Sequence, residues 1–200
     1  SLSDDALMDT VQRRTFLYFW EGAEPNSGLA PERYHVDGVY PENDANVVTS
    51  GGSGFGIMAI LAGIDRGYVT REEGLARMER IVSFLEKADR FHGAYPHWWY
   101  GDTGKVKPFG QKDNGGDLVE TAFLMQGLLA VHQYYINGNE KEKAQAARID
   151  QIWLGNGLPH TWVQRMYDYV YPCRSLSYPR STGSCLSRWL GAERSYRLPT

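Results

Sequence analysis

Two segments of this chain are apolar on nearly every side, over lengths that suit a helix rather than a strand. The first runs from residue 54 to 64 and is followed by Arg66-Gly67, and the second runs from residue 118 to 130 after Asp117. A surface helix shows one apolar stripe, so a helix without a polar side predicts burial among neighbours. A glycine just beyond the last turn is typical of a helix C-terminus. These segments therefore predict two inner helices.

Three further segments have one apolar side, which predicts surface helices. The first begins at Asp4 or Asp5, the second opens with the capping box Thr70-Arg71-Glu72-Glu73, and the third covers residues 139–153 and is more charged. The core-facing residues expected of the first helix are Leu7, Met8, Val11, Thr15, Tyr18 and Phe19, and those of the second are Leu75, Met78, Ile81, Val82 and Leu85.

Surface and buried helices alternate along the chain, and long glycine-containing loops precede the buried ones. Such an order predicts an all-α fold in which inner and outer helices form a double-layered ring, with a cleft at one end. Five helices are too few to close such a ring, so we expect an incomplete toroid with helix faces exposed to self-association. No alternation typical of strands is present.

Composition and motifs exclude several classes of function. A net charge of −3 without a basic cluster argues against nucleic acid, and no apolar run approaches the roughly 20 residues of a membrane span. Two cysteines, Cys173 and Cys185, cannot supply a disulfide framework or a common four-ligand zinc site. The glycine-rich run at 51–56 lacks the Gly-Lys-Ser/Thr ending of a phosphate loop. The scattered histidines predict no metal site, and no cofactor is expected; they include His92, His97 and His132.

The last 47 residues differ from the rest in composition. Residues 1–153 hold 15 Lys and Arg against 22 Asp and Glu, whereas residues 154–200 hold six Arg against two acidic residues. This tail also contains six serines and four prolines and shows neither a helical nor a strand period. The composition predicts two parts, a helical domain at 1–153 and an atypical tail at 154–200 that is disordered or binds a partner.

Three motifs in the first part resemble the putative glucoamylase proteins that include glycoside hydrolase family 144, the endo-β-1,2-glucanases. They are the run from Val39 to Gly56, the tetrapeptide Tyr95-Pro96-His97-Trp98, and the run from Lys112 to Leu124. The resemblance implies an (α/α)6 toroid, of which residues 1–153 would be the N-terminal part, and hydrolysis of a glucan, with inversion, without metal or cofactor. It also implies export from the cell, but it does not separate α-glucans from β-1,2-glucans.

The tail departs from this family, whose members continue with Tyr-Gly-Trp-Glu-Met-Asp-Tyr and a Gly-Tyr-Asn-Glu-Cys helix. Permissible codons for residues 153–174, read one base later, can spell these family motifs in their own order. We therefore hypothesise that the tail is translated out of frame. The resemblance implies an essential glutamate in the Asn-Glu-Cys motif, and this chain has Arg165 and Met166 in its place. Activity of the chain as it stands is accordingly in doubt.

The strongest candidates for catalysis are Asp113, Asp117 and Glu120. Glycoside hydrolysis needs one carboxylic acid and one carboxylate, and carboxylates crowded in a poorly solvated cleft acquire separated pKa values. Asp117 and Glu120 lie three residues apart at the start of a buried helix, whose N-terminus stabilises negative charge. The alternative is that Asp117 is only an N-cap and Glu120 its capping partner. The resemblance favours the catalytic assignment.

Other polar and aromatic residues are candidates for binding the sugar. Stacking faces and hydrogen bonds are expected from an aromatic group, with the alternative that its tryptophans are core residues. The group consists of Tyr95, His97, Trp98, Trp99 and Tyr100. Asn43, Asp44 and Asn46 could bind sugar hydroxyls or merely cap turns, and Arg33 could clamp substrate or lie exposed in a loop. A carbohydrate-binding or scaffold fragment without catalysis remains the alternative function.

Overall fold

The structure is a computed structural model that describes residues 3–40, 42 and 44–154. The chain divides into two units, residues 1–157 and 158–200, and every described residue lies in the first. Three predictions therefore fall outside the described part: the domain boundary at 153, the atypical character of the tail, and its translation out of frame. Asn43, Arg165 and Met166 also lie outside it.

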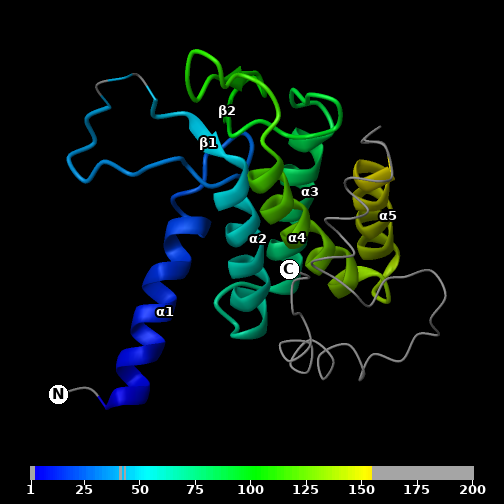
Figure 1. Cartoon of the computed structure of the whole chain (residues 1–200). Coiled ribbons are helices and arrows are strands. Elements are labelled where there is room, and N and C mark those ends of the chain that lie inside the picture. The colour runs from blue at the N-terminus through cyan, green and yellow to red at the C-terminus, as the bar shows by residue number, and fades with distance from the viewer. Residues whose placement is uncertain (1–2, 41, 43, 155–200) are drawn as a thin grey trace, which may run out of the picture. The chain divides into compact units, whose positions relative to one another are not determined.

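The described part is mostly helical, as predicted. Its helices are α1 (Asp4–Trp20), α2 (Ser50–Asp65), α3 (Arg71–Leu85), α4 (Leu118–Tyr135) and α5 (Glu140–Leu154), and all five were expected within a few residues of these bounds (Figure 1). The first helix is capped by Ser3, whose hydroxyl accepts a hydrogen bond from Ala6 N at 3.3 Å, so Asp4 and Asp5 lie in its first turn. No described helix is long and apolar enough to cross a membrane.

A small antiparallel sheet was not predicted. It consists of β1 (Val47–Thr49), β2 (Trp98–Tyr100) and β3 (Val106–Lys107), in the order β1-β2-β3, with Val48 opposite Trp99. Strands of two or three residues are too short to show a period of two, so the prediction that the fold lacks strands was wrong. The sheet joins the loops that precede α2 and α4.

Helices α2 and α4 form the most extensive helix pair in the described residues. Their backbones approach closely where glycines face each other, since a Cβ added at Gly54 would lie 2.2 Å from Phe123 O and one at Gly127 would lie 2.6 Å from Gly54 O. Burial of the two helices is less complete than their sequences predicted. Their large apolar side chains that remain exposed are Phe55, Met58, Leu118, Val119 and Phe123, and the rings of Phe55 and Phe123 contact each other.

Helices α3 and α5 cover the core from one side. The predicted capping box of Thr70 and Glu73 is present, and the whole apolar stripe predicted for α3 is buried. Between α3 and α5, the Arg71 side chain binds the buried carboxylate of Glu142 and lies over the Tyr134 ring.

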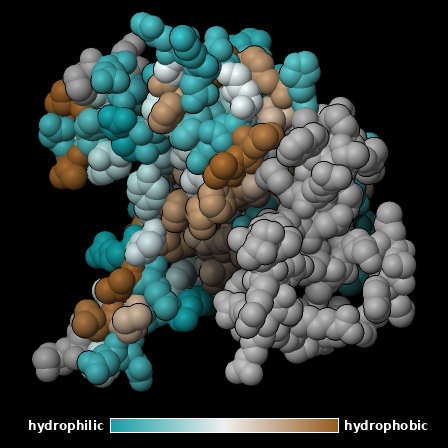
Figure 2. Space-filling model, viewed as in Figure 1, coloured by the Kyte–Doolittle hydropathy of each residue, from teal (hydrophilic) through white to brown (hydrophobic). Residues whose placement is uncertain are grey.

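Helix α1 buries only Phe16. Leu7, Met8 and Val11, which were expected to face the core, are at least half exposed, and Figure 2 shows apolar surface along this helix. The amphipathic pattern identified a helix correctly, but the described part of the chain supplies no cover for this end of its apolar side.

Acid is expected to destabilise the fold through its ion-paired carboxylates. Hydrogen bonds from Arg148 lower the pKa of Glu86, and those from Arg71 lower the pKa of Glu142. A carboxylate whose pKa is lower in the folded state stabilises the fold fully above its unfolded pKa, about 4.3 for glutamate, and loses that contribution as the pH falls through the folded pKa. Urea unfolding should therefore give constant stability above about pH 5 and falling stability below about pH 4. Glu142→Gln should flatten this fall, and a stability that rises on acidification would contradict the prediction.

Candidate functional site

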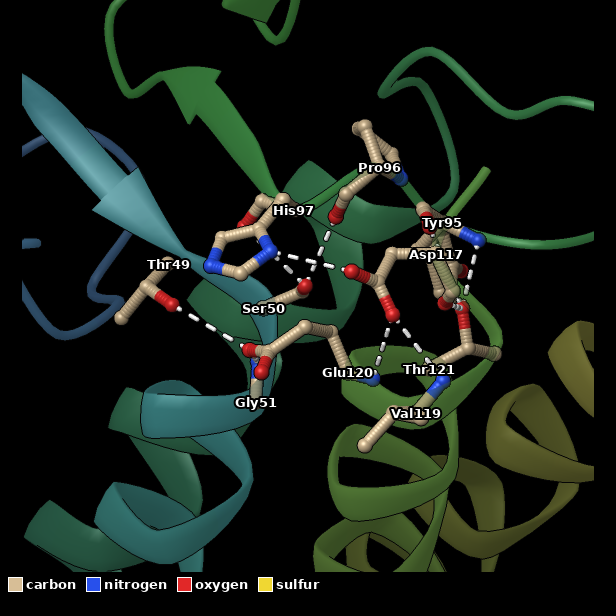
Figure 3. A network of polar contacts seen from close by, with 10 residues as sticks. All are labelled: Thr49, Ser50, Gly51, Tyr95, Pro96, His97, Asp117, Val119, Glu120 and Thr121. Atoms are coloured by element: carbon tan, nitrogen blue, oxygen red, sulfur yellow. Dashed lines mark hydrogen bonds and ion pairs between the residues drawn. The ribbon is translucent and has the colours of Figure 1, made fainter. Parts of the chain in front are cut away.

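The N-termini of α2 and α4 meet the segment that leads into β2 (Figure 3). Ser50 Oγ donates to Pro96 O at 2.7 Å, which ties the start of α2 to this segment. Thr121 Oγ1 accepts from Tyr95 N at 2.9 Å, and Asp117 N donates to Tyr95 O at 2.7 Å, which tie the start of α4 to it. The two inner helices and the segment 95–97 are thus fixed against one another by hydrogen bonds.

Asp117 uses both oxygens of its carboxylate. Oδ1 accepts from Val119 N and from Glu120 N, each at 3.0 Å, so Asp117 is the N-cap of α4. Oδ2 lies 3.0 Å from Nδ1 of His97 (Figure 3). The N-cap alternative raised from the sequence is therefore observed, and it is combined with a contact to a predicted substrate-binding residue.

Glu120 does not complete a capping box with Asp117, but reaches across to the other inner helix. Its Oε2 accepts from Gly51 N at 2.8 Å and from Thr49 Oγ1 at 3.5 Å. Thr49, the N-cap of α2, makes no side-chain capping bond of its own. Glu120 thus supplies from α4 the negative group that the N-terminus of α2 favours. No described residue bonds its other oxygen, Oε1.

Glycine at position 51 is what lets Glu120 approach. A Cβ on Gly51 would lie 2.2 Å from Glu120 Oε2. The glycine-rich start of α2 is therefore a contact surface for α4 and its carboxylate, which agrees with the sequence-based rejection of a phosphate loop. The sequence pattern did not identify Gly51 as part of the site, although a glycine cluster inside an apolar helix was the available signal.

An aromatic group lies beside the carboxylates. The His97 ring is 4.2 Å from the Phe109 ring and 5.3 Å from the Trp98 ring, centroid to centroid. Trp98 also packs against Phe109 at 4.7 Å and lies under Nζ of Lys107 at 5.2 Å. His97 and Trp98 are partly exposed and Phe109 is half exposed. Phe109 and Lys107 were not among the predicted site residues.

Trp99 takes the alternative assignment, as a core residue. It is fully buried, its indole Nε1 donates to Asp89 O at 3.1 Å, and its ring packs against Phe84 and Tyr95. A side chain with no exposed surface cannot stack on a sugar, which corrects the assignment of Trp99 to substrate binding. The same correction applies to Tyr95, which is also fully buried. Alternation along β2 is the physical reason, because neighbouring side chains of a strand point to opposite faces.

The remaining candidates lie in loops. Asp113 is exposed, and no described residue contacts its side chain through a hydrogen bond or ion pair. Arg33 binds Glu32 and lies 3.8 Å from Asp44 Oδ2, whereas Asp44 is buried and no described residue bonds its Oδ1. Asn46 accepts from Gly101 N through its main-chain oxygen. The described residues contain no group of three or more His, Cys, Asp or Glu side chains that could hold a metal ion.

Removing the Glu120 carboxylate should weaken the junction of the two inner helices. Glu120→Ala leaves the N-terminus of α2 without its side-chain acceptor, which is expected to cost about 1–2 kcal/mol, the range for a lost N-cap. The matched control is Glu140→Ala, because Glu140 also lies in a first turn but its side chain is 92% exposed. Urea unfolding measures both variants. Equal stability of the two would show that the bond between Glu120 and Gly51 does not stabilise the fold.

Comparison with known proteins gives close relatives, although no family model matches the chain. A putative glucoamylase from Bacteroides caccae is 95% identical, with a TM-score of 0.74 over 76% of this chain and 37% of its own. An endo-β-1,2-glucanase from Chitinophaga pinensis, solved with sophorotriose and glucose, is 68% identical, with a TM-score of 0.78 over 82% of this chain and 39% of its own.

A third relative is an exo β-1,2-glucooligosaccharide sophorohydrolase from Parabacteroides distasonis. It is 53% identical over 171 residues, which are 85% of this chain and 22% of the relative. The chain thus spans between about a fifth and two fifths of the length of these three proteins.

Proposed function

This chain is a homologue, over at least 76% of its length, of a segment of the putative glucoamylase and β-1,2-glucanase proteins, and from that premise we propose that it is part of a glycoside hydrolase acting on a β-1,2-linked glucan. The identity of 68% to an endo-β-1,2-glucanase carries the proposal. The two relatives described above whose names state a linkage are both named for β-1,2 linkages, which favours this linkage over α-glucans.

The fold supports the proposal of a partial (α/α)6 toroid. In such a ring, α2 and α4 are neighbouring inner helices, and α1, α3 and α5 are outer ones. The close packing of α2 against α4, and the amphipathic character of α3, agree with this arrangement. The N-termini of both inner helices then lie at the same end, where Asp117, Glu120 and His97 are gathered.

The roles proposed for the side chains follow from their contacts. Glu120, anchored through Oε2 with Oε1 unbonded, is suited to act on the substrate as acid or base. His97 and Trp98 offer a hydrogen-bonding edge and a stacking face for a sugar ring. Asp113 remains a proposed catalytic residue, and Arg33, Asn43, Asp44 and Asn46 remain proposed substrate contacts.

The test is an assay of the purified chain with β-1,2-glucan and with sophorotriose, with maltotriose as the α-linked control. We expect sophorotriose to bind in calorimetry and maltotriose not to bind. Any release of reducing sugar should disappear in Glu120→Gln, a substitution that keeps the shape of the side chain. Absence of both binding and turnover would contradict the proposal for this chain.

Binding without turnover would support the second candidate function, a non-catalytic carbohydrate-binding fragment. The observation that favours it is length, because the chain spans at most 39% of the three relatives described. A catalytic group of the relatives that lies beyond this span would be absent.

Self-association through the exposed apolar side of α1, and export from the cell, are further parts of the proposal.

The origin of the tail has its own test. We propose that residues 154–200 are translated out of frame. Sequencing the gene across codons 145–200 should then show codons for residues 164–167 that read Asn-Glu-Cys one base later. An intact mass that agrees with all 200 residues, together with codons that do not allow this reading, would rule the hypothesis out.

A further inference from the structure

The side chain of His97 is held on three sides. Nδ1 lies 3.0 Å from Asp117 Oδ2 (Figure 3). One ring face packs against Phe109 at 4.2 Å, and Trp98 meets the ring edge-on at 5.3 Å, centroid to centroid. The side chain nevertheless keeps 23% of its surface exposed. No described residue bonds Nε2, and Nε2 is not among the buried polar atoms that lack a partner.

The contact with Asp117 fixes where the proton of a neutral His97 lies. A carboxylate only accepts hydrogen bonds, so the ring atom that faces it must carry the proton. The neutral ring is therefore protonated on Nδ1, and Nε2 carries a lone pair. Asp117 cannot turn away easily, because its Oδ1 is held by the amides of Val119 and Glu120.

We propose that Asp117 is a positioning residue that holds His97 in the Nδ1-protonated form, with Nε2 presented as the acceptor for a sugar hydroxyl of the bound glucan. This rests on the proposed function of the site. The proposal also gives different roles to the carboxylates of Asp117 and Glu120. Both oxygens of Asp117 are engaged in holding other groups, whereas Glu120 keeps one oxygen unbonded.

A second histidine provides an internal reference. His132 Nε2 lies 3.1 Å from Asp150 Oδ2, and the His132 side chain is almost fully buried. By the same reasoning a neutral His132 is protonated on Nε2, the opposite form to that of His97. The two pairs have the same chemistry but only one of them faces the proposed site.

The experiment is long-range nitrogen–proton correlation NMR of the histidine rings at pH 8, where an ordinary histidine with a pKa of about 6.5 is neutral. We expect His97 to show the Nδ1-protonated pattern and His132 the Nε2-protonated one. Asp117→Asn keeps a good N-cap but presents an amide donor to His97, so His97 should change to the other form. Asp150→Asn, at the reference pair, should leave His97 unchanged. A wild-type His97 protonated on Nε2 would overturn the inference without any variant.

Sophorotriose is the ligand probe. Its addition should shift the Nε2 resonance of His97, and Asp117→Asn should weaken its binding by roughly threefold to tenfold, the range for one lost hydrogen bond. Asp150→Asn should bind it as the wild type does. Binding that leaves the His97 signals unmoved would overturn the inference while the proposed function stands. The expected ring forms without any binding would support the positioning by Asp117 and contradict the proposed function for this chain.

Discussion

Replacing Gly54 by alanine should separate the two inner helices and destabilise the chain by on the order of 3 kcal/mol. A Cβ at this position would lie 2.2 Å from Phe123 O, 2.5 Å from Phe123 C and 2.8 Å from Leu124 N. All three are main-chain atoms of α4, so no side-chain rotation can relieve the overlap. The better helix propensity of alanine offsets only about 1 kcal/mol.

Gly52→Ala is the matched control for this prediction. Gly52 lies two residues earlier in the same helix, and a Cβ there would lie 2.5 Å from Cγ2 of Thr49, the end of a side chain that can turn about its Cα–Cβ bond. We expect Gly52→Ala to lose less than about 1 kcal/mol, because the overlap is with a side chain and the better helix propensity of alanine offsets about 1 kcal/mol. Urea unfolding of both variants checks the pair. Equal stability of Gly54→Ala and Gly52→Ala would mean that the helices do not meet through Gly54.

The close contact of α2 with α4 at Gly54 should also control the geometry of the site. Glu120 lies on α4 and bonds to Gly51 on α2, so a change in the distance between the helices moves the two bonding partners apart. In Gly54→Ala we therefore expect faster hydrogen exchange at the Gly51 amide as well as lower stability. Protection of that amide equal to the wild type, in a destabilised variant, would show that the overlap is absorbed elsewhere.

Helices were predictable from this sequence because their signals are local. The capping box at Thr70 and Glu73, the apolar stripe of α3 and the glycine after α2 each lie within a few residues of the structure that they specify. The sheet could not be predicted in this way. Its strands are two or three residues long, and they pair across about 50 residues of sequence, from Val48 to Trp99.

For the candidate site, the sequence indicated residue types and their neighbourhood but not their contacts. The spacing of Asp117 and Glu120 predicted a shared face at a helix start, and both do lie at the start of α4. That Glu120 would cap α2 depends on Gly51, 69 positions earlier, and on the crossing at Gly54. Likewise, no local signal distinguishes Trp98 from Trp99 until the register of β2 is known.

The two adjacent tryptophans should therefore respond oppositely to substitution. Trp99→Ala removes a fully buried ring that packs against Phe84 and Tyr95 and donates to Asp89 O, so we expect a loss of about 3–5 kcal/mol in the free energy of unfolding. A loss of this size is a large part of the 5–15 kcal/mol typical of a native domain. Thermal and urea unfolding measure it directly.

Trp98→Ala is the matched partner, because it makes the same change one residue away on the other face of β2. The Trp98 ring is partly exposed and contacts His97, Phe109 and Lys107, so stability should fall by less than about 1 kcal/mol. Its effect should instead appear in sophorotriose binding, which we expect to weaken about tenfold through loss of an aromatic stacking face. Unchanged binding in a folded Trp98→Ala variant would show that the sugar does not stack on this aromatic group. It would also contradict the assignment of one β2 tryptophan to the core and the other to the substrate.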